Sequence, residues 1–345
     1  MSTRPNLDRC IDGNAGLAAL IDDQGALDWI CIPRMDGDPV FCGLLGAGTQ
    51  PGDGGWRFCL AGQRDSRQTY LRNTANLEIV LTDAEGNAVR ILDFAPRFRK
   101  AGRMFRGHSA IRLIEPLAGT PRLTVSLRPR WAYGAHPPGM TRGTNHVRYS
   151  LGPQVLRLTT DAPLDYVLGE TPFLLERPLA FILDPDETLS DHPMTIACAI
   201  LDETRRYWLD WVRGLALPVN FQDVVIRAAI TLKLFENEET GAIVAALTTS
   251  IPEYGASGRT RDCRLCWLRH SCFTVQALNS LNATRTMEDY LAYVSNLAAA
   301  SESGYVQPMF GLGLERVLDE HIVSGLPGCR GFGPVRQCRL DAGAE

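Results

Sequence analysis

Ten consecutive residues, 263–272, combine side chains that bind metals with side chains that bind polar ligands. Cys263, Cys266, His270 and Cys272 are zinc-ligand types, and the first two have C-x-x-C spacing. On a helix, Cys266 and His270 would share a face while Cys272 pointed away. Structural zinc sites draw ligand pairs from two separate segments, and no second pair lies nearby in the sequence. The spacing therefore favours buried thiols beside a polar patch over the alternative of a zinc module, and we expect no metal and no cofactor.

Composition excludes several other classes of protein. The 345 residues are 45% hydrophobic and 21% charged, and 35 basic against 39 acidic residues give a net charge of -4. No run approaches the roughly 18 apolar residues of a transmembrane helix. The polar N-terminus lacks the apolar stretch of a secretory signal, so we expect the ten cysteines to be reduced. These features predict a cytoplasmic protein that binds neither nucleic acid nor membranes.

The first 201 residues have the alternating pattern of short antiparallel strands. Runs 17–21 and 26–32 flank a turn-forming segment and predict a hairpin, and runs 77–82 and 88–94 predict a second. Other strand candidates share the same apolar alternation: 110–114, 123–127, 147–150, 155–159 and 195–201. So many strands without a helical period between them predict an antiparallel sandwich.

After residue 201 the apolar period lengthens to that of helices. We predict helices over 203–212, 221–235, 267–281 and 286–300, the last opened by Thr286 and Asp289 as a capping pair. The predicted organisation is a β domain (1–201), a linker helix (202–220) and the beginning of a helical domain (221–345).

The segment Cys266-Trp267-Leu268-Arg269 resembles the substrate-binding signature of glycoside hydrolase family 15, the family of glucoamylases and bacterial trehalase-like enzymes. Further segments resemble family motifs in the same order along the chain: 13–14, 18–21, 33–41, 241–253, 307–311, 326–328 and 331–336. Several ordered motifs make this resemblance more specific than any single motif.

The resemblance implies an N-terminal β supersandwich joined by a linker helix to an (α/α)6 toroid. It also implies inverting hydrolysis of α-glucosidic bonds by two glutamates, which stand roughly 6.5–9.5 Å apart in such enzymes. Charged side chains beside an aromatic ring suit a sugar, because sugar hydroxyls both donate and accept hydrogen bonds. By resemblance, the substrate-binding residues are Asp262, Trp267, Arg269, His270, Arg330 and Arg336. Trp267 as ordinary core and Arg269 as an ion-pair partner are the alternatives.

The sequence departs from the family at several of these positions. The family has an acidic residue after the signature arginine, where this chain has His270, which cannot accept two hydrogen bonds as a carboxylate does. Segment 260–265 lacks the family's aromatic residues, and Phe310 and Cys329 stand where the family usually has tyrosine.

The chain also ends nine residues after Arg336, where the family continues through most of the barrel. Both family glutamates are expected beyond this point, so we assign no catalytic residue and expect an incomplete toroid. Glu253, Glu315 and Glu320 do not match the family's acid or base, and we expect Glu315 to pair with Arg316 or to be solvated.

Two hypotheses follow from these observations. The first is a family 15-like protein of glucoamylase or trehalase type, inactive because both glutamates are absent. The alternative is a non-catalytic protein that binds carbohydrate or a partner through its β domain. An α-glucoside or oligosaccharide is the expected ligand, and an open barrel would favour self-association through exposed helical faces.

Overall fold

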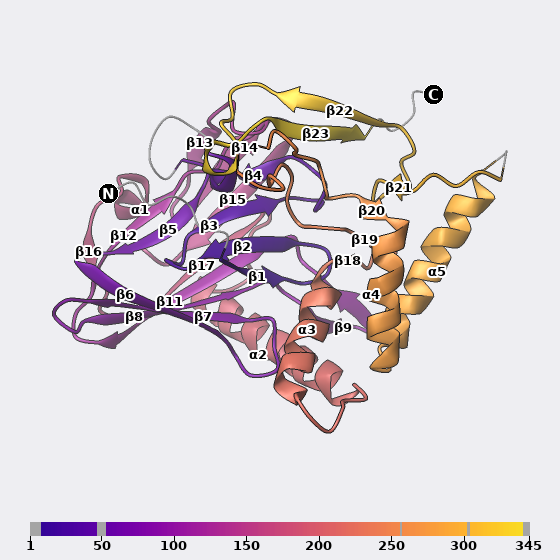
Figure 1. Cartoon of the computed structure of the whole chain (residues 1–345). Coiled ribbons are helices and arrows are strands. Elements are labelled where there is room, and N and C mark those ends of the chain that lie inside the picture. Colours follow the sequence, from indigo (N-terminus) through magenta and orange to yellow (C-terminus); the bar gives the residue numbers. More distant parts are fainter. Residues whose placement is uncertain (1–7, 47–52, 256, 302–303, 341–345) are drawn as a thin grey trace.

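A computed structural model describes residues 8–46, 53–255, 257–301 and 304–340 (Figure 1). Two antiparallel sheets dominate it. The first is seven-stranded: β1 (Arg9–Gly13), β2 (Ala18–Asp22), β3 (Leu27–Cys31), β5 (Trp56–Leu60), β12 (Arg122–Leu127) and β16 (Phe173–Leu174) in that order, with β4 (Pro39–Phe41) beside β3. The second is eight-stranded, in the order β13 (Gly139–Arg142), β14 (His146–Leu151), β15 (Gln154–Thr160), β17 (Leu179–Pro185), β11 (Ala110–Ala118), β8 (Ala88–Phe94), β7 (Leu77–Asp83) and β6 (Gln63–Tyr70).

The main hydrophobic core lies between these two sheets. Trp56, Phe58 and Phe181 form its aromatic centre, with ring centroids 5.1–6.5 Å apart. Both predicted hairpins are confirmed, because β2 pairs with β3 and β7 pairs with β8. The antiparallel β domain is therefore confirmed, and its strands alternate as a half-buried sheet requires.

The predicted strand over 195–201 is wrong, because these residues belong to helix α2 (Pro193–Arg213). The helix begins with Pro193 in its first turn, a position that suits proline because no intrahelical bond is lost there. Ala197 and partly buried Met194 and Leu201 pack with apolar residues of β8, β11 and β17. Helix α2 thus covers the outer face of the eight-stranded sheet, so the apolar alternation over 195–201 reflects this helix face.

Three further helices follow, of which the first packs beside α2 and the other two lie at the right of Figure 1. They are α3 (Gln222–Leu234), α4 (Leu268–Ser280) and α5 (Thr284–Ala299), close to the predicted ranges. Helix α5 begins before the expected capping pair: Ala283 is its N-cap, while Thr286 lies inside the helix and bonds Glu236. A β domain followed by helices is confirmed, and the toroid stays a prediction.

The remaining elements are short. They are η1 (Gly43–Leu45), β9 (Phe98–Lys100), β10 (Arg103–Phe105), α1 (Leu164–Leu168), β18 (Glu236–Asn237), β19 (Ala242–Ile243), β20 (Cys266–Trp267), β21 (Met309–Phe310), β22 (Leu318–Val323), η2 (Cys329–Gly331) and β23 (Val335–Leu340). Strands β20 and β21 pair with each other, as do β22 and β23.

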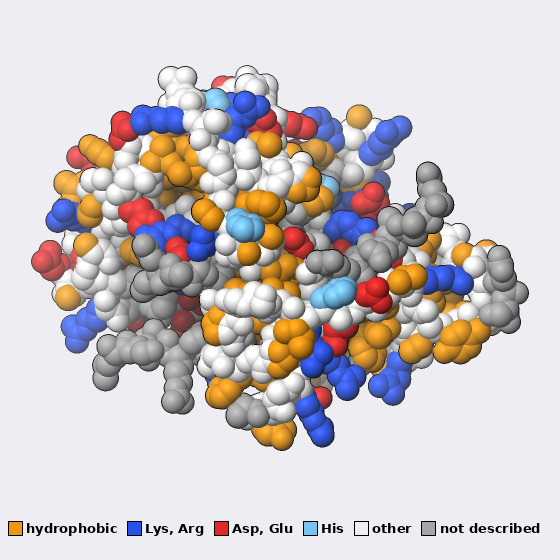
Figure 2. Space-filling model, turned by 90° about the horizontal axis from the view of Figure 1, so that it is seen from above, with side chains coloured by type: hydrophobic (Ala, Val, Ile, Leu, Met, Phe, Trp, Pro, Cys, Tyr) orange, Lys and Arg blue, Asp and Glu red, His pale blue; other side chains and the backbone are white. Residues whose placement is uncertain are grey.

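The outer surface of α4 and α5 carries apolar side chains. Phe273 is 65% exposed and Leu291 is 55% exposed. Seen from above in Figure 2, charged side chains of both signs are scattered over the face, and hydrophobic side chains gather at the right-hand end, where α5 lies in Figure 1. Self-association through this surface stays a prediction.

One buried ion pair joins the two sheets. Arg112 on β11 binds Asp93 on β8 through Nε and Nη2, both at 2.8 Å, and both side chains are 1% exposed. The same guanidinium donates to the carbonyl of Trp56 on β5 of the other sheet (2.8 Å) and to that of Gly25 in the turn between β2 and β3 (2.7 Å). The Arg112 guanidinium therefore makes four hydrogen bonds. Because the site is buried, water could not replace a bond that is lost.

The ladder between β8 and β11 provides a matched test of this ion pair. Arg112→Met leaves the Asp93 carboxylate buried and unpaired, so we expect a loss of about 3–5 kcal/mol in the free energy of unfolding. Arg90 and Glu115 form a second cross-strand ion pair on the same two strands, but each side chain is 32% exposed. Arg90→Met should cost less than about 1 kcal/mol. Urea unfolding of both variants measures the difference, and equal losses would contradict the assignment of Arg112 as the link between the sheets.

Candidate functional site

The candidate site is organised around one buried ion pair. Arg264 is fully buried in the segment before β20, and its Nε and Nη2 bind the two oxygens of Asp262 at 2.9 and 2.7 Å. The Asp262 carboxylate also accepts the backbone N–H of Arg264 and that of Cys338 on β23, each at 3.1 Å. Four donors therefore surround one carboxylate, which fixes its position.

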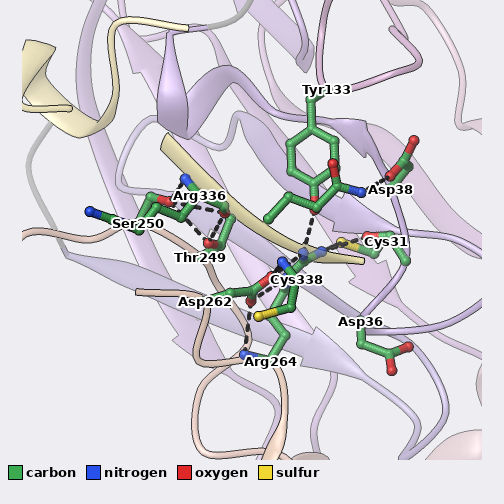
Figure 3. A network of polar contacts seen from close by, with 12 residues as sticks. Cys31, Asp36, Asp38, Tyr133, Thr249, Ser250, Asp262, Arg264, Arg336 and Cys338 are labelled. Carbon is green, nitrogen blue, oxygen red and sulfur yellow. Dashed lines mark hydrogen bonds and ion pairs between the residues drawn. The ribbon is translucent and has the colours of Figure 1, made fainter. Parts of the chain in front are cut away.

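The far side of the Arg264 guanidinium reaches into the β domain (Figure 3). It donates to the Tyr133 hydroxyl, to the Gly37 carbonyl and, at 3.5 Å, to the Cys31 sulfur. Burial alone would lower the pKa of Arg264, but the Asp262 carboxylate raises it well above the usual value, so the guanidinium stays charged. One cation thus joins the sandwich to the segment that carries the signature residues.

Hydrogen bonds from three hydroxyl groups attach strand β23 to the segment that contains Asp262 and Arg264. The Thr249 hydroxyl donates to the Arg336 carbonyl (2.6 Å), and the Arg336 N–H donates to the Ser250 hydroxyl (2.7 Å). The Thr260 hydroxyl donates to the Pro334 carbonyl (2.6 Å). Strand β23 is therefore held beside residues 249–264, and a cleft lies between them.

This cleft, which we call the Trp267 cleft, has a volume of about 520 Å³. Its lining residues come from residues 258–267 and from β21, β22 and β23: Gly258, Arg259, Thr260, Arg261, Asp262, Leu265, Trp267, Met309, Leu318, Glu320, Arg336 and Cys338. An open, partly aromatic, partly charged wall of this size suits a small polar ligand.

Trp267 is the only aromatic residue among the lining residues that the structure describes. Strand pairing with Met309 on β21 orients it, and its ring lies 5.6 Å from the His270 ring, edge to face. The indole N–H is buried and has no hydrogen-bond partner. Tryptophan prefers to bury its ring while its N–H finds an acceptor, so this N–H is a donor in need of a partner.

The structure brings three of the six predicted binding residues together. Asp262, Trp267 and Arg336 line the cleft, whereas Arg269 and His270 are exposed in the first turn of α4 and Arg330 is exposed in η2. Only the ring contact with Trp267 connects His270 to the cleft.

Glu320 also lines the cleft, although its sequence motif gave it no role. Its carboxylate binds Arg336 Nη1 at 2.6 Å across the β22–β23 hairpin. The register places Glu320 opposite Cys338, two residues from Arg336, so the two charges are diagonal neighbours. Glu320 and Arg336 could have been paired from the sequence only by predicting a hairpin over 318–340.

The other carboxylates of the matching segments lie elsewhere. We expected Glu315 to pair with Arg316 or to be solvated, but its carboxylate pairs with Arg34 of the β domain at 2.8 Å. Arg316 instead donates to the Leu297 carbonyl. Glu253 is exposed and lies 3.5 Å from Arg259.

The cysteine and histidine cluster does not converge on one point. Cys266 is buried against Ser271, at 3.4 Å, while Cys272 is exposed on α4. Among the described residues, no group of three or more histidine, cysteine or acidic side chains is placed to hold a metal ion. None of the described helices has the length and apolarity needed to cross a bilayer.

Comparison with known proteins agrees with the resemblance. The sequence model described as "Glycosyl hydrolases family 15" matches residues 220–321, which include Asp262, Trp267 and Glu320. The trehalase of Mycolicibacterium smegmatis is 27% identical, covering 92% of this chain and 51% of the relative. The trehalase of Mycobacterium tuberculosis is 26% identical (92% and 50%), and that of Thermoplasma volcanium is 23% identical (94% and 52%).

The chain thus spans about half the length of the curated relatives that it matches. The alignments cover the β domain as well as the helical segment, because they extend over more than nine-tenths of this chain. The chain is therefore similar to glycosyl hydrolases family 15 over residues 220–321 and to trehalases over nine-tenths of its length.

Proposed function

We propose that this protein is a glycoside hydrolase of the trehalase type. We also propose that its Trp267 cleft binds a glucose unit of an α-glucoside such as trehalose. The observation that carries the proposal is that the Trp267 ring and the Arg336–Glu320 ion pair line one open cleft. An aromatic ring covers the apolar face of a sugar, while ionised groups bond its hydroxyls.

The bonding of the two cleft carboxylates supports a binding role. Asp262 already accepts four hydrogen bonds, and Glu320 is paired with Arg336. A general acid must present a proton to the substrate, whereas both oxygens of Asp262 and one oxygen of Glu320 already accept N–H donors of the chain. We therefore assign Asp262 a positioning role, Glu320 and Arg336 contacts with sugar hydroxyls, and neither carboxylate a proton-transfer step.

We expect Trp267→Ala to weaken trehalose binding roughly tenfold, because the ring face that covers the sugar is lost. Calorimetric titration with trehalose, and with cellobiose as a β-linked comparison, measures the change. Trp131→Ala is the matched control, because Trp131 is also partly buried but lies outside the cleft.

Equal trehalose affinity of the Trp267→Ala variant and the unaltered protein would contradict the assignment of the cleft. Glucose release from trehalose is followed on the same samples. Release that disappears in Glu320→Gln while binding persists would show that Glu320 is catalytic and overturn its binding role.

His270→Asp offers a second, gain-of-function test. A carboxylate accepts two hydrogen bonds where the neutral imidazole accepts one, and it would balance the charge of neighbouring Arg269. The first turn of α4 also favours a negative charge. We expect trehalose to bind about threefold to tenfold more tightly.

His270→Asn is the control, because it has the same size as aspartate without the charge. Titration of both variants separates charge from shape. An equal or weaker affinity of His270→Asp would mean that the exposed start of α4 takes no part in binding.

A further inference from the structure

The charged side chains that line the Trp267 cleft do not balance one another. They are three arginines, Arg259, Arg261 and Arg336, and two carboxylates, Asp262 and Glu320. A neutral sugar brings no charge into the cleft, so it would leave this excess of positive charge as it is. The partners of these side chains decide which cation a ligand would meet without competition from the chain.

Both carboxylates of the lining have a cationic partner of their own. Asp262 pairs with Arg264 at 2.7 Å, where both side chains are no more than 2% exposed, and Glu320 pairs with Arg336 at 2.6 Å. Among the described residues, neither carboxylate lies within ion-pair distance of Arg259 or Arg261. The positive charge that the lining does not balance therefore belongs to Arg259 and Arg261.

Arg261 has an available guanidinium in a fixed piece of backbone. Its side chain is exposed and forms no ion pair or hydrogen bond with the residues that the structure describes. Its backbone carbonyl accepts the Ser250 N–H at 2.8 Å, which ties the residue to the framework that also holds Arg336. An exposed arginine keeps its charge and all five N–H donors, so Arg261 can bind an anionic group directly.

Arg259 is only loosely paired. Its Nη1 lies 3.5 Å from a carboxylate oxygen of Glu253, which is not among the lining residues, and the two side chains are 74% and 51% exposed. Exposed ion pairs contribute little stability, so an anionic ligand in the cleft could replace Glu253 at small cost.

We propose that the Trp267 cleft prefers an α-glucoside whose sugar carries a negatively charged group, a carboxylate or a phosphate ester, over its neutral counterpart. This inference rests on the proposed function, because it keeps the sugar against the Trp267 ring and adds a contact between the anionic group and Arg261. A carboxylate or phosphate presents two oxygens that match the fork of a guanidinium. The anion also balances charge in the cleft, which a sugar hydroxyl cannot do.

Two matched pairs of α-glucosides test this preference and distinguish the two anionic groups. Methyl α-D-glucuronide is compared with methyl α-D-glucoside, and trehalose 6-phosphate with trehalose, by calorimetric titration of the whole chain. We expect the anionic member of at least one pair to bind about threefold to tenfold more tightly, as one exposed charge-assisted contact allows. An advantage in the first pair assigns a carboxylate, and an advantage in the second assigns a phosphate. Added NaCl should reduce the advantage, because salt screens exposed charges.

Arg261→Gln removes the charge without removing a side-chain contact on which the fold depends. We expect this variant to lose the advantage of the anionic ligand, while the neutral member of each pair binds as before. Arg205→Gln is the matched control, because Arg205 is also an exposed arginine without an ion pair among the described residues, but it lies on α2 outside the cleft. The advantage should persist in this control. Thermal unfolding of both variants checks that they are folded.

Equal affinity within both pairs, or an advantage that persists in Arg261→Gln, would overturn the preference for an acidic sugar. Either outcome leaves the proposed function intact, provided that the neutral sugars bind and that Trp267→Ala weakens their binding. Failure of all four sugars to bind would contradict the proposed function as well, so the two failures are distinguishable.

Discussion

The buried guanidinium of Arg264 is the interaction on which the arrangement of the cleft depends. It contacts Asp262 in its own segment and Cys31, Gly37 and Tyr133 in the β domain. Burying a cation costs free energy unless it is paired with an anion and its N–H groups have acceptors. Here the neighbouring segments provide both the anion and the acceptors. The segment carrying Trp267 is consequently fixed against the sandwich, whose own core lies between its two sheets.

This network changes the role that we assign to Asp262 beside the signature segment. Asp262 had been expected to bind substrate, yet its carboxylate is directed inward and bonded to Arg264 and β23. Trp267 is held next to it by pairing with β21 and faces the cleft. The motif therefore combines one residue that organises the site with one that is free to contact a ligand.

Local patterns in the sequence were sufficient for much of the fold. The β2–β3 and β7–β8 hairpins and helices α3, α4 and α5 follow from alternation, turn residues and the helical period. The segment 195–201 was misassigned because a helix with one buried stripe can also alternate over a few residues. The contacts of Arg264 could not be predicted, because its partners stand more than 70 residues away in the sequence, apart from Asp262.

Amide hydrogen exchange in Arg264→Met tests most directly whether this guanidinium holds the cleft on the sandwich. The account predicts faster exchange in residues 260–268 and in β23, while amides of β8 and β11 keep their protection because the core between the sheets is intact. Unchanged exchange in residues 260–268, or equal loss of protection throughout the sandwich, would contradict it.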